Sequence, residues 1–276
     1  MRFVVILLFL FVRNISSSFC QEICLPFEIG NGLTFATLDT VYISKSTGLV
    51  DERQKPIYRI YMHVLNEDKW SEAIEVSFSN GKYTDYHPEI FQDSLMIFIS
   101  RRPEPGTNDP VPYGNLWMVM KSNNAWGEPQ FISELNHKGH DTYPTLTKSG
   151  RLYFNSDRPG GKGSMDIYVS NYMNGKFSDP TPLNALNTTD SENDLVIDPD
   201  EKFIIFNRYS FETGELDLFI SFNEEGNWSE AQPLTQINEK GVFELTPTLS
   251  TDKKYFYYEV EGRVHCLLLE TILKKS

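Results

Sequence analysis

Residues 141–183 read DTYPTLTKSGRLYFNSDRPGGKGSMDIYVSNYMNGKFSDPTPL, and this stretch decides the fold. It contains three short apolar runs of alternating polarity, and turn residues such as Lys148-Ser149-Gly150 and Asn174-Gly175 close them. The pattern predicts one antiparallel sheet of three to four short strands. A sheet of that size is marginally stable alone, so it needs neighbouring sheets to cover its apolar faces.

Copies of the stretch recur along the chain at a spacing near fifty residues. Phe177 has counterparts at Trp126, 51 residues earlier, and at Trp228, 51 residues later, and Trp70 lies a further 56 residues before Trp126. Other features repeat in step with these aromatic residues, namely the strand starts at Arg59, Asn115, Asp166 and Asp217 and the prolines Pro88, Pro144 and Pro247. Several features in step at this period indicate the blades of a β-propeller, with the regular aromatic residues packed between them.

We therefore predict an all-β fold, a β-propeller of about five blades, each an antiparallel sheet of three to four strands, closed near the N- and C-termini. The units lie at about 33–84, 85–140, 141–190, 191–241 and 242–276. The fifth unit contains no Trp-Ser element, so its outer strand is missing or comes from the N-terminal segment. Six blades are possible only if an end segment builds a short extra sheet.

In the third unit, Tyr143-Pro144 is followed by GRLYFNSDRPGG at 150–161, by Asp166-Ile-Tyr and by Gly175-Lys-Phe. This order resembles the WD-like β-propeller repeat of TolB and of many secreted bacterial proteins. The resemblance covers about residues 30–265 and is weakest in the first and fifth units. Val196 stands where the repeat has proline. The resemblance implies an architecture and a bacterial, exported protein, but no activity, because propellers host many unrelated functions.

The first twenty residues, MRFVVILLFLFVRNISSSFC, predict a secretory signal peptide. Arg2 precedes an apolar run at 3–12, which is too short to span a bilayer, and small residues follow at 16–18. Cleavage after Cys20 leaves 21–276 as a single propeller domain that is secreted or periplasmic, with no transmembrane span. The alternative is a lipoprotein anchored through Cys20, for which the preceding Phe19 is a poor fit.

Two cysteines remain after cleavage, Cys24 at the start of the mature chain and Cys266 in the last unit. The two ends of a propeller meet where its ring closes. In an oxidising compartment we expect a Cys24–Cys266 disulfide there, and two unrelated buried cysteines are the alternative. No Cys-x-x-Cys or paired histidine spacing indicates a zinc site.

The formal net charge of −13 excludes a nucleic-acid-binding protein of the usual kind, because such proteins carry basic patches. The sequence contains no Gly-x-Ser-x-Gly and no His-Glu-x-x-His motif. We expect no cofactor and no bound metal. The expected partner is a protein or a glycan of unknown identity, and the expected oligomeric state is a monomer.

Candidate binding residues lie just before each repeated proline, where the innermost strands begin. Three positions before that slot the sequence has Asp85, Asp141, Asn193 and Glu244, and one position before it has His87, Tyr143, Leu195 and Thr246. In the fourth unit, Glu192 and Asp194 adjoin Asn193 and Leu195. A ring of carboxylates at a channel mouth would suit a cation, a polyol or the acid and base of glycoside hydrolysis. The alternative is that each carboxylate accepts hydrogen bonds from turn amides.

Arg102 and Arg158 share one repeat slot, and Arg208 lies close to it. The resemblance implies that these arginines pack over aromatic rings while aspartates such as Asp166 hold the Gly-rich turn. Contact with an anion or a substrate is the alternative. The segment 102–114 contains four prolines, which predicts a stiff surface loop and a candidate contact surface.

These patterns favour a non-enzymatic binding module of the cell envelope, which engages a protein or glycan through the channel mouth and the loop 102–114. The alternative is a glycan-processing hydrolase that uses the acidic residues at the channel mouth.

Overall fold

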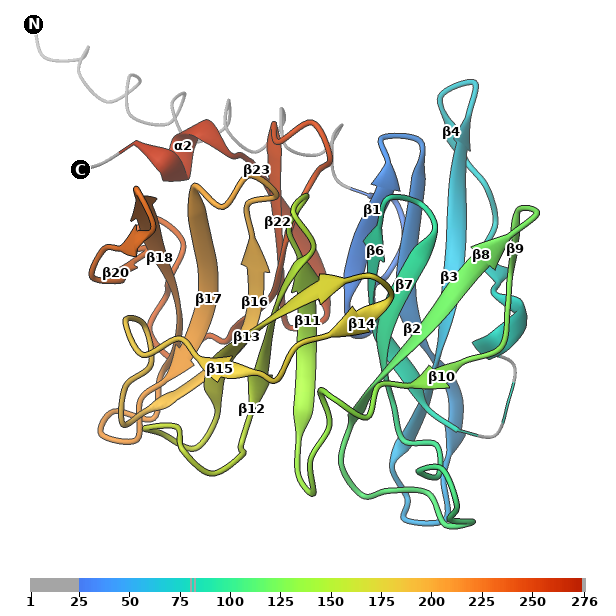
Figure 1. Cartoon of the computed structure of the whole chain (residues 1–276). Coiled ribbons are helices and arrows are strands. Elements are labelled where there is room, and N and C mark those ends of the chain that lie inside the picture. Colours follow the sequence, from blue (N-terminus) through green and yellow to red (C-terminus); the bar gives the residue numbers. More distant parts are fainter. Residues whose placement is uncertain (1–24, 80, 82, 275–276) are drawn as a thin grey trace, which may run out of the picture.

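The computed structural model describes residues 25–79, 81 and 83–274. Five antiparallel sheets form the molecule, and each comes from one sequence unit (Figure 1). The first sheet consists of β1 (Leu33–Thr37), β2 (Thr40–Val50), β3 (Pro56–Asn66), β4 (Lys69–Trp70) and β5 (Ile74–Glu75). The second consists of β6 (Asp85–Phe91), β7 (Leu95–Ser100), β8 (Asn115–Ser122), β9 (Ala125–Trp126) and β10 (Gln130–Phe131). A 3-10 turn, η1 (Ser77–Ser79), lies between them.

The remaining sheets repeat this plan. The third consists of β11 (Asp141–Leu146), β12 (Arg151–Ser156), β13 (Asp166–Met173), β14 (Lys176–Phe177) and β15 (Thr181–Pro182). The fourth consists of β16 (Ser191–Ile197), β17 (Phe203–Tyr209), β18 (Leu216–Glu224), β19 (Asn227–Trp228) and β20 (Gln232–Pro233). The fifth has three strands, β21 (Glu244–Leu249), β22 (Tyr255–Val260) and β23 (Arg263–Leu268), and the short helix α2 (Glu270–Leu273) follows it.

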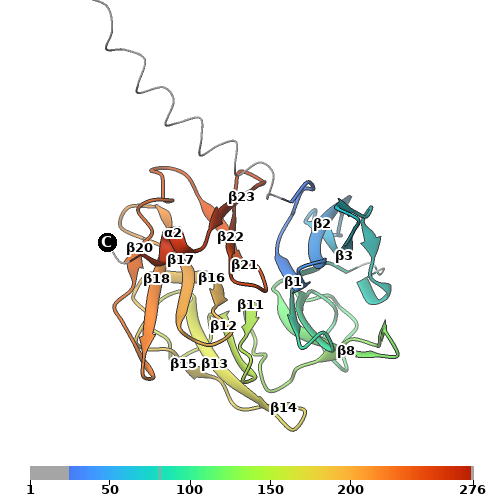
Figure 2. The same cartoon turned by 90° about the horizontal axis from the view of Figure 1, so that it is seen from above.

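The sheets are arranged radially, as the repeats predict. The first strands β1, β6, β11, β16 and β21 contact one another in turn, and β21 also contacts β1, so the ring closes (Figure 2). The prediction of an all-β, five-bladed propeller is confirmed. Each blade has three long strands, and in the first four blades the third strand also pairs with two very short ones.

The core lies between the blades. The second strand of each blade is covered on both faces, which is why runs such as 95–100, LMIFIS, are apolar at nearly every position and fully buried. The repeated tryptophans fill the spaces between blades: Trp126 of blade two packs edge-on against Tyr42 of blade one, and Trp228 of blade four packs against Tyr153 of blade three.

The ring closes through the segment 25–32. Leu25, Phe27 and Ile29 pack into a cluster with Val41 and Ile43 of blade one and with Tyr257 and Cys266 of blade five. The hydroxyl of Thr248 in β21 donates to the carbonyl of Leu33 in β1 at 3.1 Å. This segment packs between the two blades, and within the described residues blade five keeps three strands, so its outer strand is missing.

Cys266 is buried in that closing cluster. Cys20 and Cys24 and the whole signal sequence lie outside the described residues. Leu25, which directly follows Cys24 in the sequence, packs in the same cluster as Cys266. The Cys24–Cys266 disulfide stays a prediction.

Candidate functional site

Four carboxylates occupy equivalent positions at the starts of the first strands. They are Asp85, Asp141, Glu192 and Glu244, and all four are buried. The expectation that Asn193 fills this position in blade four is wrong. The first strands of blades two to five each contain a bulge of one extra residue, and β16 corresponds to β11 at a spacing of 51 residues, so that Glu192 is the counterpart of Asp141 and Ile197 that of Leu146. The counterpart of Pro144 is therefore Leu195 and not Val196, and the acidic position three residues before it is Glu192.

Each of the first three carboxylates is paired with an arginine from the adjacent second strand or the residues just after it. The shortest nitrogen–oxygen distances are 2.7 Å for Arg102–Asp85, 2.7 Å for Arg158–Asp141 and 2.8 Å for Arg208–Glu192. Burial raises the pKa of Asp85 to about 6, and Arg102 opposes that rise, so this carboxyl is ionised at neutral pH. The acidic and the basic candidates from the sequence therefore pair with one another, and this ion pair is repeated in blades two, three and four.

The pairs hold the loops that connect the blades. Asp141 accepts a hydrogen bond from the backbone amide of His137 at 2.8 Å, and Arg158 donates to the carbonyl of Leu135. In the next blade Glu192 accepts from the amide of Thr188 at 3.1 Å, and Arg208 donates to the carbonyl of Leu186 at 3.1 Å. These carboxylates are thus directed into the blades, where they accept hydrogen bonds from loop amides. This is the structural alternative that the sequence left open.

The arginines also cover aromatic rings, as the resemblance implied. The guanidinium carbon of Arg158 lies 5.2 Å from the ring centre of Phe154 and 5.0 Å from that of Tyr168. Asp166 holds the Gly-rich turn by accepting from the amides of Lys162 and Gly163 at 3.0 and 3.1 Å. Glu244 is paired with no arginine within the described ranges, and its Oε2 is buried without a hydrogen-bond partner there.

The bulges place a second set of residues around the axis. The equivalent positions are Gly32, His87, Tyr143, Asp194 and Thr246, and all five have positive φ, at 104°, 50°, 52°, 38° and 49°. Asp194, and not Leu195 as expected, is thus the counterpart of His87 and Tyr143. A Cβ on Gly32 would lie 2.6 Å from the Cα of His87, so only glycine fits this position.

The axial residues contact one another. The rings of His87 and Tyr143 meet edge to face at 4.9 Å, and His87 Nε2 lies 3.9 Å from Asp194 Oδ1. The amide of Thr246 donates to Asp194 Oδ2 at 2.6 Å. Burial lowers the pKa of His87 to about 3 and raises the pKa of Asp194 to about 7, so His87 is neutral at physiological pH. These side chains form a narrow waist in the channel.

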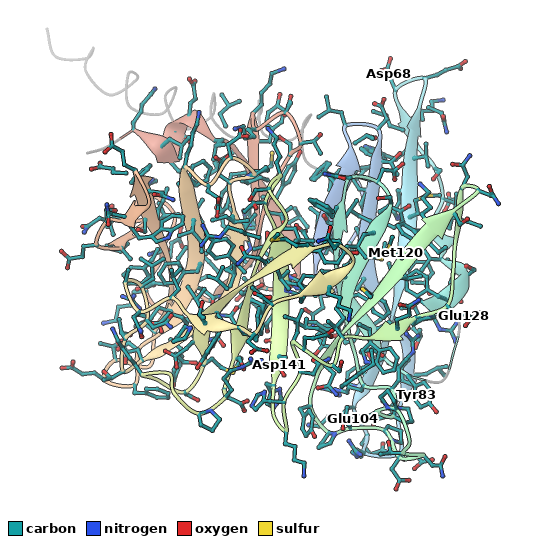
Figure 3. The ribbon with its side chains drawn as sticks, viewed as in Figure 1. Asp68, Tyr83, Glu104, Met120, Glu128 and Asp141 are labelled. Carbon is teal, nitrogen blue, oxygen red and sulfur yellow. The ribbon has the colours of Figure 1, made fainter. Side chains whose placement is uncertain are left out.

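Two openings lie on the two sides of this waist. Figure 3 fixes the orientation, with Asp141, Tyr83 and Glu104 at the lower end and Asp68 at the upper end. Residues before the bulges line the lower mouth, a cavity of about 510 Å³, and residues after the bulges line the upper mouth, of about 400 Å³. The acidic positions Asp85, Asp141, Glu192 and Glu244 line neither opening, because their side chains are directed into the blades.

The lower mouth is polar and aromatic. Its lining is Asn31, Lys55, Pro56, Tyr58, Thr84, Tyr86, Arg101, His140, Thr142, Tyr143, Asp157, Ser164, Met165 and Asn193. Of the candidate binding residues named from the sequence, Tyr143 and Asn193 belong to it. Arg101 and Asp157 are separated by 56 residues and fill the same slot after the second strand, so the equal spacing of Pro88 and Pro144 could have found them.

A second cleft, of about 330 Å³, adjoins the lower mouth and shares Thr84 and Arg101 with it. It lies between the β2–β3 hairpin and residues Asn108, Asp109 and Pro110 of the loop 102–114. Arg53 of the hairpin donates to the carbonyl of Pro110 and so holds the loop against blade one. The loop and the lower mouth therefore form one continuous surface.

Glu89 is the main titratable group of the upper mouth. Its carboxyl accepts hydrogen bonds from the hydroxyl of Thr34 at 3.1 Å and from the amide of Leu146 at 3.0 Å, and thereby connects blades one, two and three. Burial raises its pKa to about 7. Between its ordinary pKa and that value, the folded protein binds a proton at Glu89 that the unfolded chain does not.

The stability of the protein should therefore depend less on pH when Glu89 is replaced by glutamine. A carboxyl with a raised pKa in the folded state lowers the free energy of unfolding as the pH rises from about 4.5 to about 7. We expect the thermal midpoint of the parent to fall more between pH 5 and pH 8 than that of Glu89→Gln. An equal fall in both proteins would contradict this role of Glu89.

Among the described residues, no group of three or more His, Cys, Asp or Glu side chains is placed to hold a metal ion. No helix in the described part of the chain is long and apolar enough to cross a membrane.

No protein-family model matches the chain, and comparison with curated protein sequences finds no match. Solved structures do match. A TolB-like protein from Agrobacterium tumefaciens is 13% identical with a TM-score of 0.55, over 88% of this chain and 78% of that chain. A chain of the nidogen/laminin complex is 13% identical with a TM-score of 0.55, over 85% and 76%.

A gluconolactonase from Xanthomonas campestris is also similar, with 12% identity and a TM-score of 0.50 over 79% of this chain and 70% of that chain. The three proteins have different roles according to their descriptions, and all are distant in sequence. Identity this low shows a common propeller fold and no narrower family.

Proposed function

We propose that the chain is an exported, non-enzymatic binding module of the cell envelope. Its ligand, a glycan or an extended stretch of a partner protein, lies in the lower mouth and extends onto the loop 102–114. One observation carries the proposal: the lower mouth presents tyrosines, amides and cations, while the carboxylates that hydrolysis would need are used inside the blades.

The lower mouth has the features of a ligand site. Its volume of about 510 Å³ lies within the range of ordinary small-ligand sites, roughly 300–1,000 Å³. Tyr58 and Tyr86 place their ring centres 6.3 Å apart at one side, and Tyr143 lies at the waist. Tyrosine offers both a flat apolar face and a hydroxyl, which suits sugars and peptides that have polar groups around an apolar surface.

Glycoside hydrolysis ordinarily needs two carboxyl groups that face the same bond, about 5–10 Å apart. In the lower mouth the only carboxylate of the described lining is Asp157. It lies 3.0 Å from His137 Nε2 and accepts from the amide of His140 at 2.8 Å. A single carboxylate that is already engaged supports binding more than catalysis.

A hydrolase remains the second candidate, because Glu89 in the upper mouth has the raised pKa that general acids have. Asp93 also lines the upper mouth and is the carboxylate nearest to Glu89 in the sequence. It is paired with Lys121 at 2.9 Å. This candidate predicts that Glu89→Gln abolishes the release of reducing ends from an oligosaccharide.

Replacing Tyr58 by alanine should weaken ligand binding about tenfold or more, because one aromatic face of the lower mouth is lost. The probes are a set of envelope-type oligosaccharides of four to eight units and a set of ten-residue peptides, titrated by calorimetry into residues 21–276. Met173→Ala is the control, because Met173 is 68% exposed on the outer side of blade three.

Binding that both variants retain in full would place the ligand elsewhere and contradict the proposal. Steady release of reducing ends by the parent protein would favour the hydrolase instead.

A further inference from the structure

We propose that the ligand of the lower mouth is an acidic glycan, whose uronic acid carboxylates bind Arg101 and Lys55. The inference rests on the proposed function and names the class of ligand. It is carried by two cations that form no ion pair with a carboxylate within the described residues, in a chain whose formal net charge is −13.

Arg101 differs from most of the arginines of the neighbouring strands and strand ends. Within the described residues Arg59, Arg102, Arg151, Arg158 and Arg208 each form an ion pair with a carboxylate. Arg101 directly precedes Arg102 and forms no such pair there, and its Nε is buried without a hydrogen-bond partner. Its side chain interacts with the hydroxyl of Tyr86 and opposes the rise that burial causes in the pKa of that hydroxyl.

One donor of this guanidinium, the Nε, is unsatisfied within the described residues. Leaving a buried donor unpaired costs free energy, roughly 1–3 kcal/mol, and more for a charged group. A ligand carboxylate would remove that cost, because the guanidinium fork accepts a carboxylate through two parallel hydrogen bonds. Arg101 lines both the lower mouth and the cleft beside the loop 102–114, so a bound chain could reach it from either side.

Lys55 supplies the second charge. It lies at the end of the β2–β3 hairpin, where its backbone is fixed through hydrogen bonds with Asp51, and its side chain forms no ion pair within the described residues. The single carboxylate of the lining, Asp157, is held by His137 and by the amide of His140. The lower mouth therefore combines two unpaired cations with one engaged carboxylate, which favours an anionic ligand.

The rest of the lining favours a sugar over an acidic peptide. Asn31, Thr84, Thr142, Ser164 and Asn193 provide amide and hydroxyl groups, which match the neighbouring hydroxyls of a pyranose. Tyr58 and Tyr86 provide ring faces against which a sugar ring can pack. Among the described lining residues only Pro56 and Met165 are aliphatic, so pockets for apolar peptide side chains are lacking.

The test uses the mature protein and matched pairs of probes. Tetramers of galacturonate, mannuronate and hyaluronan are each compared with the same oligosaccharide after methyl esterification, which removes the carboxylate charge and keeps the sugar rings. We expect at least one acidic tetramer to bind ten times or more tightly than its ester, and its affinity to fall as salt is raised from 20 to 500 mM.

Variants then test whether Arg101 and Lys55 are the cations that bind the carboxylates of the ligand. We expect Arg101→Gln to lower affinity for the acidic tetramer about tenfold or more, and to lower affinity for its ester much less. Arg101→Lys should restore part of the loss, and Lys55→Gln should lower affinity about threefold. Lys176→Gln, an exposed lysine of blade three, is the control. Equal thermal midpoints would show that the variants fold alike.

Three outcomes would overturn the inference. If esters bind as tightly as acids, the lower mouth takes neutral glycans and the proposed function survives. If only acidic peptides bind, the partner is a protein and the proposed function again survives. If no uronate tetramer and no other oligosaccharide or peptide binds, both the inference and the proposed function fail.

Discussion

Replacing Arg158 by methionine should destabilise the protein by about 3–5 kcal/mol, which is what loss of one partner from a buried ion pair costs. Its partner Asp141 is fully buried, and the pair distance is 2.7 Å. Arg158 also donates to the hydroxyl of Ser156 at 2.8 Å and to the carbonyl of Leu135. The substitution therefore leaves a buried carboxylate without its counter-charge and a buried loop carbonyl without a donor.

Urea unfolding of the parent and the variant measures the difference. Arg151→Met is the matched control, because Arg151 pairs with Glu201 at 3.0 Å but its side chain is 41% exposed, and exposed pairs contribute only about 0–1 kcal/mol. The double variant Asp141→Asn/Arg158→Met should recover part of the loss, since no isolated charge is then buried. Similar losses in Arg158→Met and Arg151→Met would contradict the structural role of these pairs.

Replacing Cys24 by serine should lower the free energy of unfolding by about 2–5 kcal/mol, if Cys24 and Cys266 form the disulfide that we predict. The bond would connect the first segment of the mature chain to blade five, where Leu25, Phe27 and Ile29 already pack. Blade five has three strands, so the closure depends on this cluster more than on further sheet pairing.

Thiol titration gives the direct measurement. The denatured, unreduced mature protein should show no reactive thiol, and addition of a reductant should reveal two. A stability loss in Cys24→Ser that equals the loss caused by reducing the parent would assign the whole effect to the bond. Two reactive thiols before reduction would rule the disulfide out.

The fold could be predicted because its signal is repeated. Trp70, Trp126, Phe177 and Trp228 recur with the period of a blade, and each blade has the same need to fill the space beside its neighbour. The resemblance to the TolB-type repeat added detail that the structure bears out, such as the turn held by Asp166.

The candidate site could be predicted only in part. The register of β16 was wrong by one residue, because this strand contains no proline and the slot was placed at Val196, whereas the strand pairing places it at Leu195, 51 residues after Pro144. The acidic and basic candidates were treated as separate sets, although antiparallel pairing of the first two strands brings Asp85 beside Ser100, two residues before Arg102.

The lining of the lower mouth follows from the fold and not from one motif. Lys55 and Tyr58 come from the second hairpin of blade one, Arg101 follows β7, and His140 precedes β11. These residues are distant in sequence, and the radial arrangement of the blades around the axis brings them together. The packing that makes Arg101 an unpaired cation is likewise visible only in three dimensions.

The central claim is that the lower mouth is where the ligand binds. Hydrogen–deuterium exchange of the mature protein, with and without the tightest-binding probe, tests it most directly. We predict slower exchange in 51–56, 101–114 and 137–142 and unchanged exchange in the upper loops 92–94, 147–150 and 251–254. Protection confined to the upper loops would contradict the claim.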